Sequence, residues 1–251
     1  FNILAYNEGN FDLSRIKDIN VVLNSIKSIE SADLAIFINS NLVMSNMNKI
    51  LEIALTKANV AHLVTIPAGL DWNSELMRVV HMLNTNAFHI LLEDENNNLD
   101  LDALQSLDIE RILSAVRSIE EADIKLLTES ELAMTNFATL LKKALTKTGL
   151  SMVTVPAGID WTVEFANLVR VLKLDALKDA SGEYFSVEDL MNVNNIVAVL
   201  RGIEKSDIEL ITGSNLIMTN VNNLAPVVIE KAGLSASVTI PAGTDWTKEI
   251  V

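Results

Sequence analysis

Apolar residues recur along this chain at spacings that predict helices with one buried face. Trp72 is followed by apolar residues four, seven, eight and eleven positions later, and Trp161 begins the same series. Such residues share one side of a helix with 3.6 residues per turn. Asp71 and Asp160 precede the two tryptophans and can accept hydrogen bonds from the first free amides of a helix. The pattern therefore predicts two amphipathic helices, each with a capping aspartate and a buried indole ring.

Each of these helices begins at the end of a nine-residue motif, Val-Thr-Ile-Pro-Ala-Gly-x-Asp-Trp. The motif occurs at 64–72, at 153–161 with valine in place of isoleucine, and at 238–246. Its β-branched start predicts a short strand, its proline ends that strand because proline cannot donate a ladder hydrogen bond, and its glycine allows a turn. The residues expected to build the motif are Pro67, Asp71, Trp72, Pro156, Asp160, Trp161, Pro241, Asp245 and Trp246.

The motif defines a tandem repeat in the sequence. Its prolines are separated by 89 and 85 residues, and other features recur with the same period. The predicted fold class is mainly α with small β elements: tandem repeats of about 85–89 residues, each with a short β-hairpin or strand and three to four helices. We place the units at residues 1–87, 88–174 and 175–251. The third stops before the end of its last helix, so we expect a window on a longer array.

A longer helix is expected in the middle of each unit. It starts at a serine that suits the N-cap position, and leucine, methionine and asparagine recur two, four and six residues later. These serines and asparagines are Ser40 with Asn46, Ser130 with Asn136, and Ser214 with Asn220. The helix is expected to end in a left-handed residue at Asn59, Gly149 or Gly233.

A column of paired carboxylates is the strongest candidate for acid–base chemistry. It consists of Glu30 with Asp33, Glu120 with Asp123, and Glu204 with Asp207. General acid–base catalysis would need such pairs in a cleft, with shifted pKa values. Each pair instead lies at a predicted helix boundary, with a lysine or arginine three residues before the glutamate. This arrangement favours helix capping and ion pairing within the helix.

Composition narrows the classes of protein further. The chain has 251 residues, of which 49% are hydrophobic, and a net charge of −14. Nucleic-acid binding needs clustered basic residues, so this balance argues against a nucleic-acid partner. Cysteine is absent, which excludes disulfides and thiolate metal sites. No apolar run reaches 18 residues, so membrane insertion is not expected.

The three histidines are a first candidate for metal binding. His62, His81 and His89 lie near the end of the first unit and have no counterparts in the other two. Histidines that are not repeated with the unit are more typical of surface or interface positions than of a metal site.

A second candidate is a run of oxygen-bearing side chains, which resembles the start of an EF-hand calcium loop. The candidate ligands are Asp94, Asn96, Asn98 and Asp100. The calcium loop would need glycine where Leu99 stands and glutamate where Gln105 stands, because these supply the sharp turn and the bidentate ligand. A solvated polar turn is therefore favoured, and a weak calcium site stays open as the alternative.

Other catalytic patterns are missing from the sequence. No serine lies in a Gly-x-Ser-x-Gly elbow, and no glycine-rich phosphate loop occurs. The three tryptophans could form a sugar-stacking platform, but their helical spacing favours anchors in the core. We therefore expect no enzyme activity and no cofactor.

The order of these elements resembles a known kind of repeat. A helix ends in Ser-Ile-Glu-x-x-Asp-Ile-x-Leu-Leu-Thr-x-Ser, the next helix ends at glycine, and a segment closing in Ile-Pro leads into another helix. This is similar to repeat units in very long surface proteins of low-GC Gram-positive bacteria and their wall-less relatives. The resemblance implies export, attachment to the cell surface, and a role in adhesion or extracellular assembly. It transfers no functional residues.

The sequence thus predicts a structural segment of a stalk, filament or adhesin at the cell surface or outside the cell. Its expected partners are neighbouring repeats of the same array, with self-assembly or a host or cell-surface protein or glycan as further partners. The alternative is a glycan- or protein-binding module that uses the loops between repeats. A hydrolase using the glutamate and aspartate column ranks last, because it would need a deep pocket that gathers several of these carboxylates.

Overall fold

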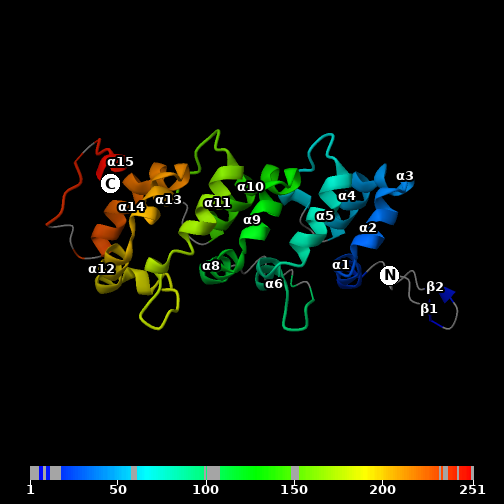
Figure 1. Ribbon diagram of the computed structural model, residues 1–251, viewed down its shortest axis with the longest axis horizontal. Coiled ribbons are helices and arrows are strands. Elements are labelled where there is room, and N and C mark those ends of the chain that lie inside the picture. Colours follow the sequence, from blue (N-terminus) through cyan, green and yellow to red (C-terminus); the bar gives the residue numbers. More distant parts are fainter. Residues whose placement is uncertain are drawn as a thin grey trace. The chain divides into compact units, whose positions relative to one another are not determined.

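The computed structural model is mainly helical, as the sequence predicts (Figure 1). It describes residues 6–7, 10–11, 18–57, 61–98, 100, 108–147, 153–231, 233, 237–241 and 243–249. The chain divides into two compact units, and from here on the first and second unit mean these two and not the three repeats of the sequence. The first comprises Phe1–Leu107 with Ser118–Leu140, and the second comprises Asp108–Arg117 with Leu141–Val251. No helix in the described ranges has both the length and the apolar character needed to cross a membrane.

In the first unit a small hairpin is followed by helices. The strands are β1 (Tyr6–Asn7) and β2 (Asn10–Phe11), and the helices are α1 (Ile19–Lys27), α2 (Ser31–Ile38), α3 (Asn41–Met44), α4 (Met47–Lys57), the 3-10 turn η2 (Ala61–Leu63), α5 (Trp72–Leu83), α6 (Asn86–Leu92) and α9 (Glu121–Thr128). The helix α10 (Glu131–Lys147) begins in this unit.

The second unit holds most of α8 (Ile109–Ser118) and the later helices. These are α11 (Trp161–Val171), the 3-10 turns η3 (Asp175–Leu177) and η4 (Asp189–Met191), α12 (Val193–Gly202), α13 (Lys205–Thr212), α14 (Asn215–Lys231) and α15 (Trp246–Glu249).

Strand structure is scarcer than predicted. Among the described residues the one sheet is the antiparallel pair β1–β2, in which Tyr6 faces Phe11, and an isolated bridge joins Lys178 to Tyr184. The predicted strand at Val64–Ile66 is wrong, and so are its counterparts in the other copies of the motif. The physical reason is that the backbone of this segment pairs with a side-chain amide instead of a neighbouring strand. Gly69 in the following turn has φ +80°, which agrees with the predicted role of glycine there.

The predicted helix starts are confirmed. Asp71 and Asp160 each accept a hydrogen bond from the amide two residues later, at the first turns of α5 and α11. Ser40 accepts the amide of Val43, and the counterparts of this serine behave alike. A side chain that accepts one of the free amides of a helix end typically stabilises the helix by about 1 kcal/mol.

Burial in the first unit follows the apolar stripe that the sequence predicts for α5. Leu76 and Val80 are buried together with Leu34 of α2, and half-buried residues of α1, α2 and α4 pack around them. The helix α5 lies against α2 and also against α9 (Figure 1). In the second unit Phe165 and Val169 of α11 are buried, and α11 packs against α13. The buried faces of α5 and α11 thus form part of the core in the two units.

The long middle helix is continuous in only two of its three expected places. The helices α10 and α14 run without a break, whereas the first copy is interrupted between α3 and α4 at Ser45–Asn46. Gly233 has φ +69°, as a left-handed C-cap requires. The predicted ends at Asn59 and Gly149 lie outside the described residues.

Replacing Trp72 by alanine is expected to destabilise the protein by about 3–5 kcal/mol, because the ring is only 8% exposed. Its Nε1 also donates to Asn48 Oδ1 at 2.6 Å, so Trp72→Phe should lose about 1 kcal/mol with the loss of that hydrogen bond. Urea unfolding followed by far-ultraviolet circular dichroism measures both effects. Trp161 is half-buried, so Trp161→Ala is the matched control with a smaller loss. Equal losses for the two alanine variants would contradict the assignment of Trp72 as a core anchor.

Candidate functional site

A buried polar junction joins the motif segment of the first unit to the start of a later helix. Glu75 in α5 is 1% exposed and accepts a hydrogen bond from Ser130 Oγ. Six residues further on, Asn136 Oδ1 accepts from the backbone amide of Thr65 at 2.6 Å, and Asn136 Nδ2 donates to the Thr65 carbonyl at 2.8 Å. The side-chain amide therefore pairs with both backbone groups of Thr65, as a neighbouring strand would. We call these four residues the first junction.

The second unit contains a junction of the same composition. Glu164 in α11 accepts from Ser214 Oγ, and Asn220 exchanges two hydrogen bonds with the backbone of Thr154, at 2.6 and 2.7 Å. Glu164, Ser214 and Asn220 are all buried. The serine–glutamate and asparagine–threonine hydrogen bonds match those of the first junction. We call these four residues the second junction.

The two junctions stabilise their buried carboxylates in different ways. In the second junction Glu164 accepts from the backbone amides of Asn215 and Leu216, at 2.9 and 3.1 Å, at the N-terminus of α14. Free amides and the helix dipole both favour a negative charge there. In the first junction Arg78 Nη1 lies 3.7 Å from Glu75 Oε2. A buried carboxylate needs such donors, because a buried charge without them costs several kcal/mol.

A serine beside a glutamate could in principle act as a nucleophile with a general base, but here the serine is buried and caps a helix. Both Ser130 and Ser214 are fully buried, so no substrate reaches their hydroxyl groups. Each hydroxyl also accepts a helix amide, from Ala133 and Ile217 respectively. The serine is therefore a helix cap whose proton is directed to the glutamate.

The carboxylate column predicted from the sequence forms capping boxes. In each pair the glutamate side chain accepts from the backbone of the aspartate, and the aspartate side chain accepts from the amide of the glutamate. The prediction of helix capping is therefore confirmed for all three pairs. The predicted pairing with the preceding basic residue is wrong, because Lys27 pairs with Glu93 and Arg117 donates to the carbonyl groups of Leu172 and Phe185.

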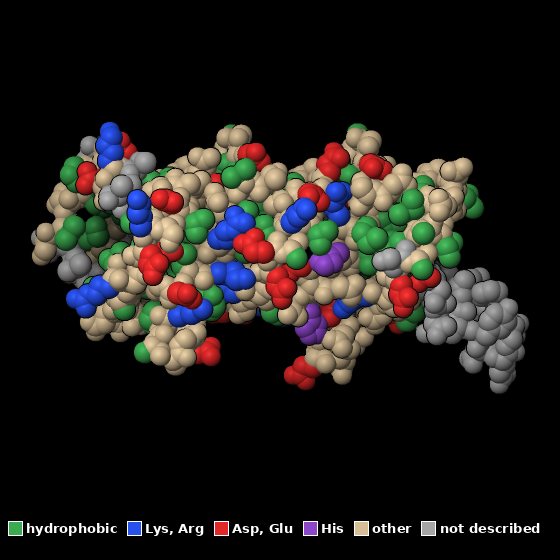
Figure 2. Space-filling view, in the orientation of Figure 1, with side chains coloured by type: hydrophobic (Ala, Val, Ile, Leu, Met, Phe, Trp, Pro, Cys, Tyr) green, Lys and Arg blue, Asp and Glu red, His purple; other side chains and the backbone are tan. Residues whose placement is uncertain are grey.

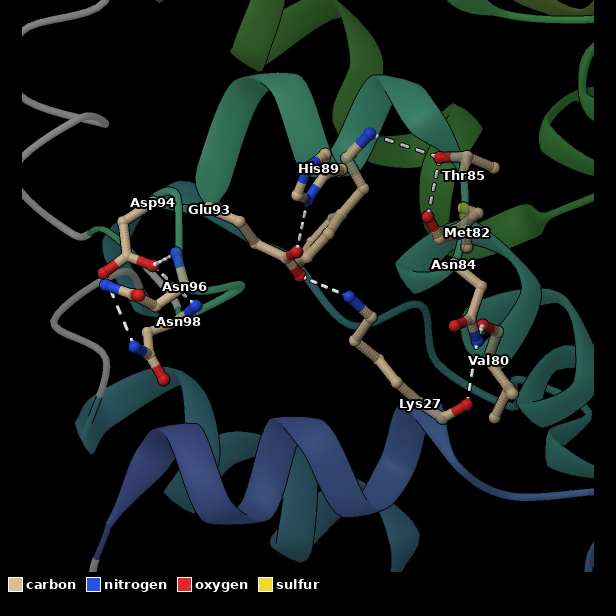
Figure 3. A network of polar contacts seen from close by, with 11 residues as sticks. Lys27, Val80, Met82, Asn84, Thr85, His89, Glu93, Asp94, Asn96 and Asn98 are labelled. Carbon is tan, nitrogen blue, oxygen red and sulfur yellow. Dashed lines mark hydrogen bonds and ion pairs between the residues drawn. The ribbon is translucent and has the colours of Figure 1, made fainter.

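Lys27, Glu93 and His89 form a polar cluster between α1 and α6 (Figure 3). Lys27 Nζ lies 2.5 Å from Glu93 Oε1, and His89 Nδ1 lies 2.7 Å from Glu93 Oε2. The Glu93 side chain is fully buried, which by itself would raise its pKa. Hydrogen bonds from Lys27 and His89 outweigh the burial, so the pKa of Glu93 is lowered from its ordinary value.

In the second unit Lys178 stands before the polar turn, at the position that Glu93 has in the first unit. The basic residue Arg117, which corresponds to Lys27, therefore has a different partner. The Arg117 guanidinium lies 4.3 Å from the centre of the Tyr184 ring, and Lys178 Nζ lies 5.0 Å from it. Burial lowers the pKa of Arg117, against the effect of the nearby Tyr184 and Glu110. An aromatic ring thus replaces the carboxylate as the partner of the cation.

The histidines do not come together. His81 Nε2 lies 3.0 Å from Asp123 Oδ1, His89 contacts Glu93, and His62 is exposed in η2. Within the described ranges no group of three or more histidine, aspartate or glutamate side chains is placed to hold a metal ion. The interpretation of His81 and His89 as interface residues agrees with their contacts.

The calcium candidates lie in a turn closed by its own hydrogen bonds. Asp94 Oδ1 accepts from the amides of Asn96 and Asn98 at 2.8 and 2.9 Å, and the Asp100 amide donates to the Leu92 carbonyl. The hydrogen bond from the Asn98 amide is the main cause of the lowered pKa of Asp94. Asp179 closes the corresponding turn of the second unit, with Ser181 as the main cause of its lowered pKa. Calcium binding stays a prediction that these contacts do not test.

The nine motif residues are distributed between the core and the surface. The capping aspartates, Asp71, Asp160 and Asp245, are exposed. Trp72 is buried and Trp161 and Trp246 are half-buried, while Pro67 and Pro156 are half-buried and Pro241 is exposed. A shallow hollow of about 390 Å³ lies beside the first copy of the motif; its lining residues are Glu52, Leu55, Thr56, Ala61, Val64 and Ile66.

Sequence reasoning noted the serine and asparagine of each junction but missed the glutamate. Glu75, Glu164 and Glu249 each follow the motif tryptophan by three residues. On the amphipathic pattern the glutamate falls beside the apolar stripe, where it looks like a solvated charge in the first turn of a helix. The recurrence of a glutamate three residues after the tryptophan in all three copies of the motif was the signal in the sequence that could have identified it.

Comparison with known proteins gives no further information about the chain. No protein-family model, no curated protein and no solved structure matches it significantly.

Replacing Asn220 by alanine is expected to destabilise the protein by about 1–3 kcal/mol, because it removes three hydrogen bonds to Thr154 and Leu216. The matched control is Asn46→Ala, in which the equivalent asparagine is exposed and bonds within its own helix region. It should change stability by less than about 0.5 kcal/mol. Urea unfolding of the two variants makes the comparison. If Asn46→Ala lost as much unfolding free energy as Asn220→Ala, the hydrogen bonds of the junction would add nothing to stability.

The lowered pKa of Glu93 predicts a pH dependence of stability. The ionised carboxylate stabilises the folded protein above the ordinary glutamate pKa of 4.5, and this contribution is lost as the pH falls through the lower folded value. The stability difference between the natural protein and Glu93→Gln should therefore be constant above about pH 5 and shrink below it. Urea unfolding from pH 7 to pH 3 measures it, with the exposed Glu95→Gln as control. A difference that grew on acidification would contradict the sign of the shift.

Proposed function

We propose that the chain is a structural segment of a bacterial cell-surface or extracellular stalk, filament or adhesin, built from like units and without catalytic activity. The observation that carries this proposal is the buried junction, which occurs in both compact units with the same residue types in the same roles. A contact made again with each copy of a sequence is typical of arrays in which neighbouring units bury one another's surfaces.

The chemistry of the junction supports a mechanical role. Its carboxylates and hydroxyls are closed to solvent and satisfied by one another or by helix amides, so they fix the position of a helix and offer nothing to a substrate. In the described part of the chain, no buried side-chain nitrogen or oxygen atom lacks a hydrogen-bond partner. Fully satisfied polar contacts of this kind set one register between packed elements.

The cell-surface setting rests on the sequence. The repeat resembles units of very long bacterial surface proteins, and the acidic, cysteine-free composition is compatible with export. Self-assembly or contact with a host or cell-surface protein or glycan would be the partners of such a segment.

The second candidate function is a binding module for a glycan or protein. It is favoured by the two polar turns, because the carboxylates of Asp94 and Asp179 each accept two backbone amides of the turn and hold it in one conformation. A turn ordered in advance loses less conformational freedom when it binds a partner.

The structural proposal predicts that the chain is exposed on intact cells of its source. An antibody raised against the purified chain should label unpermeabilised cells, and brief protease treatment of these cells should remove the signal. An antibody against a cytoplasmic protein serves as the control. Labelling only after lysis would overturn the surface role. Retention of the purified chain on a glycan array, lost in Asp94→Ala or Asp179→Ala, would favour the second candidate.

A further inference from the structure

Each half of the junction occurs three times in the sequence, and the residues that the structure describes form two complete junctions. The first half, here called the tail half, runs from the threonine of the motif to the glutamate and is present at 65–75, 154–164 and 239–249. The second half, here called the head half, runs from the capping serine to the asparagine and is present at 40–46, 130–136 and 214–220. Tail 65–75 pairs with head 130–136, and tail 154–164 pairs with head 214–220. In the described part of the chain, the head half at 40–46 and the tail half at 239–249 are not paired with a complementary half.

The remaining halves have nearly the same sequence as two halves that do pair. Head 40–46 differs from head 214–220 only by Val43 for Ile217 and Ser45 for Thr219. Tail 239–249 differs from tail 154–164 only at Ile240, Thr244 and Lys248. The second junction therefore shows how these two sequences fit each other, with every hydrogen-bonding residue retained.

The head half at 40–46 is open to solvent. Leu42 is 76% exposed, whereas its counterpart Leu216 in the second junction is 8% exposed. Asn46 is exposed and its Nδ2 bonds to its own helix region, while Asn220 is buried against Thr154. Ile36 in the preceding helix is 71% exposed. Hydrophobic side chains gather over α2 and α3 in the space-filling view (Figure 2).

The tail half at 239–249 is also open. Thr239 and Glu249 are exposed, and the Glu249 carboxylate has no hydrogen bond or ion pair to the described residues. The tryptophan helix has nevertheless begun, since the amides of Lys248 and Glu249 donate to the Asp245 carbonyl at 2.9 and 3.1 Å. The carboxylate thus stands on a formed helical turn, as in the two complete junctions.

We propose that the head half at 40–46 binds the tail half at 239–249 of a second copy of this chain, so that copies join head to tail. In this contact Glu249 accepts from Ser40 Oγ and from the first amides of α3, and Asn46 pairs with the backbone of Thr239. Leu42 becomes buried, as Leu216 is. The proposal rests on the structural function proposed above and names the chain itself as partner.

The two halves are different surfaces, so the contact is heterologous and each bound copy exposes a new head or a new tail. Association of separate chains lacks the high effective concentration of halves that belong to one chain. The intermolecular contact is therefore expected at chain concentrations of tens to hundreds of micromolar, on the order of the affinities of small interfaces.

Sedimentation velocity of the full chain over a range of concentrations tests the proposal. The average mass should rise from that of the 27.5 kDa chain to the dimer and larger species. Leu42→Asp removes the apolar contact and places a carboxylate near Glu249, and Glu249→Lys replaces the acceptor by a donor. Each alone should raise the apparent dissociation constant at least about tenfold. Asn46→Ala is a milder head variant that leaves the exposed leucine in place.

Mixing separates a head-to-tail contact from other modes of association. Leu42→Asp retains a working tail and Glu249→Lys a working head, so the mixture should form a one-to-one dimer and nothing larger. Leu200→Asp and Glu230→Lys are matched controls, because both residues are exposed and lie outside the two halves. These controls should associate like the natural chain.

A chain that stays monomeric at every concentration would overturn the proposal, and so would association that survives Leu42→Asp, Asn46→Ala and Glu249→Lys. A mixture of the two blocked variants without a dimer would overturn it as well, provided that both keep the natural circular dichroism spectrum. These results are independent of the cellular location. A surface-exposed chain that remains monomeric would contradict only the head-to-tail contact, and a self-associating chain inside the cell would contradict only the proposed function.

Discussion

The buried glutamate in the first turn of α5 and of α11 is the constraint on which the rest of the structure depends. A carboxylate that is removed from water must find donors, and in the two units the donor serine lies 55 and 50 residues further on, at the start of another helix. The helix start in turn needs acceptors for its free amides: the serine supplies one in both units, and Glu164 supplies more in the second. Two local needs are met by one contact that is distant in sequence.

The asparagine six residues later adds a directional restraint to this contact. Its side chain offers one acceptor and two donors, and all three are used: one for the amide of the extended segment, one for its carbonyl, and one for the carbonyl of its own helix. A serine–glutamate contact alone would leave the helix free to rotate about it. The second contact, Asn136 with Thr65 or Asn220 with Thr154, fixes that rotation.

The groups around the junctions vary while the roles stay the same. Arg78 stands near the first buried glutamate, whereas two backbone amides serve the second. Similarly, Lys27 pairs with Glu93 in the first unit, and Arg117 stacks on Tyr184 in the second, where the place of the carboxylate is taken by a lysine. In both units the cation thus has a partner, a carboxylate in the first and an aromatic ring in the second, although the partner residues differ.

The sequence allowed the helices, their capping residues and their apolar faces to be predicted, because these depend on neighbours within a few residues. Asp71, Ser130 and the capping box at Glu120 are examples of such local chemistry. The strand expected at Val64–Ile66 was wrong because β-branched residues favour extended backbone without specifying the partner. Glu75 was missed for the complementary reason. Its burial is decided by a serine 55 residues away, and neither periodicity nor spacing within one copy contains that information.

A junction built from buried polar groups also determines which contacts the chain avoids. An apolar face alone accepts many partners and many registers, since burial of apolar area is not directional. Here a shift in register would place the glutamate against apolar atoms and leave the asparagine without the backbone groups that satisfy it, at a cost of several kcal/mol. Head and tail halves therefore discriminate through the penalty for wrong contacts as much as through the strength of the right one. In the proposed head-to-tail contact, the polar groups beside the exposed Ile36 and Leu42 would reject partners that lack a matching carboxylate and extended segment.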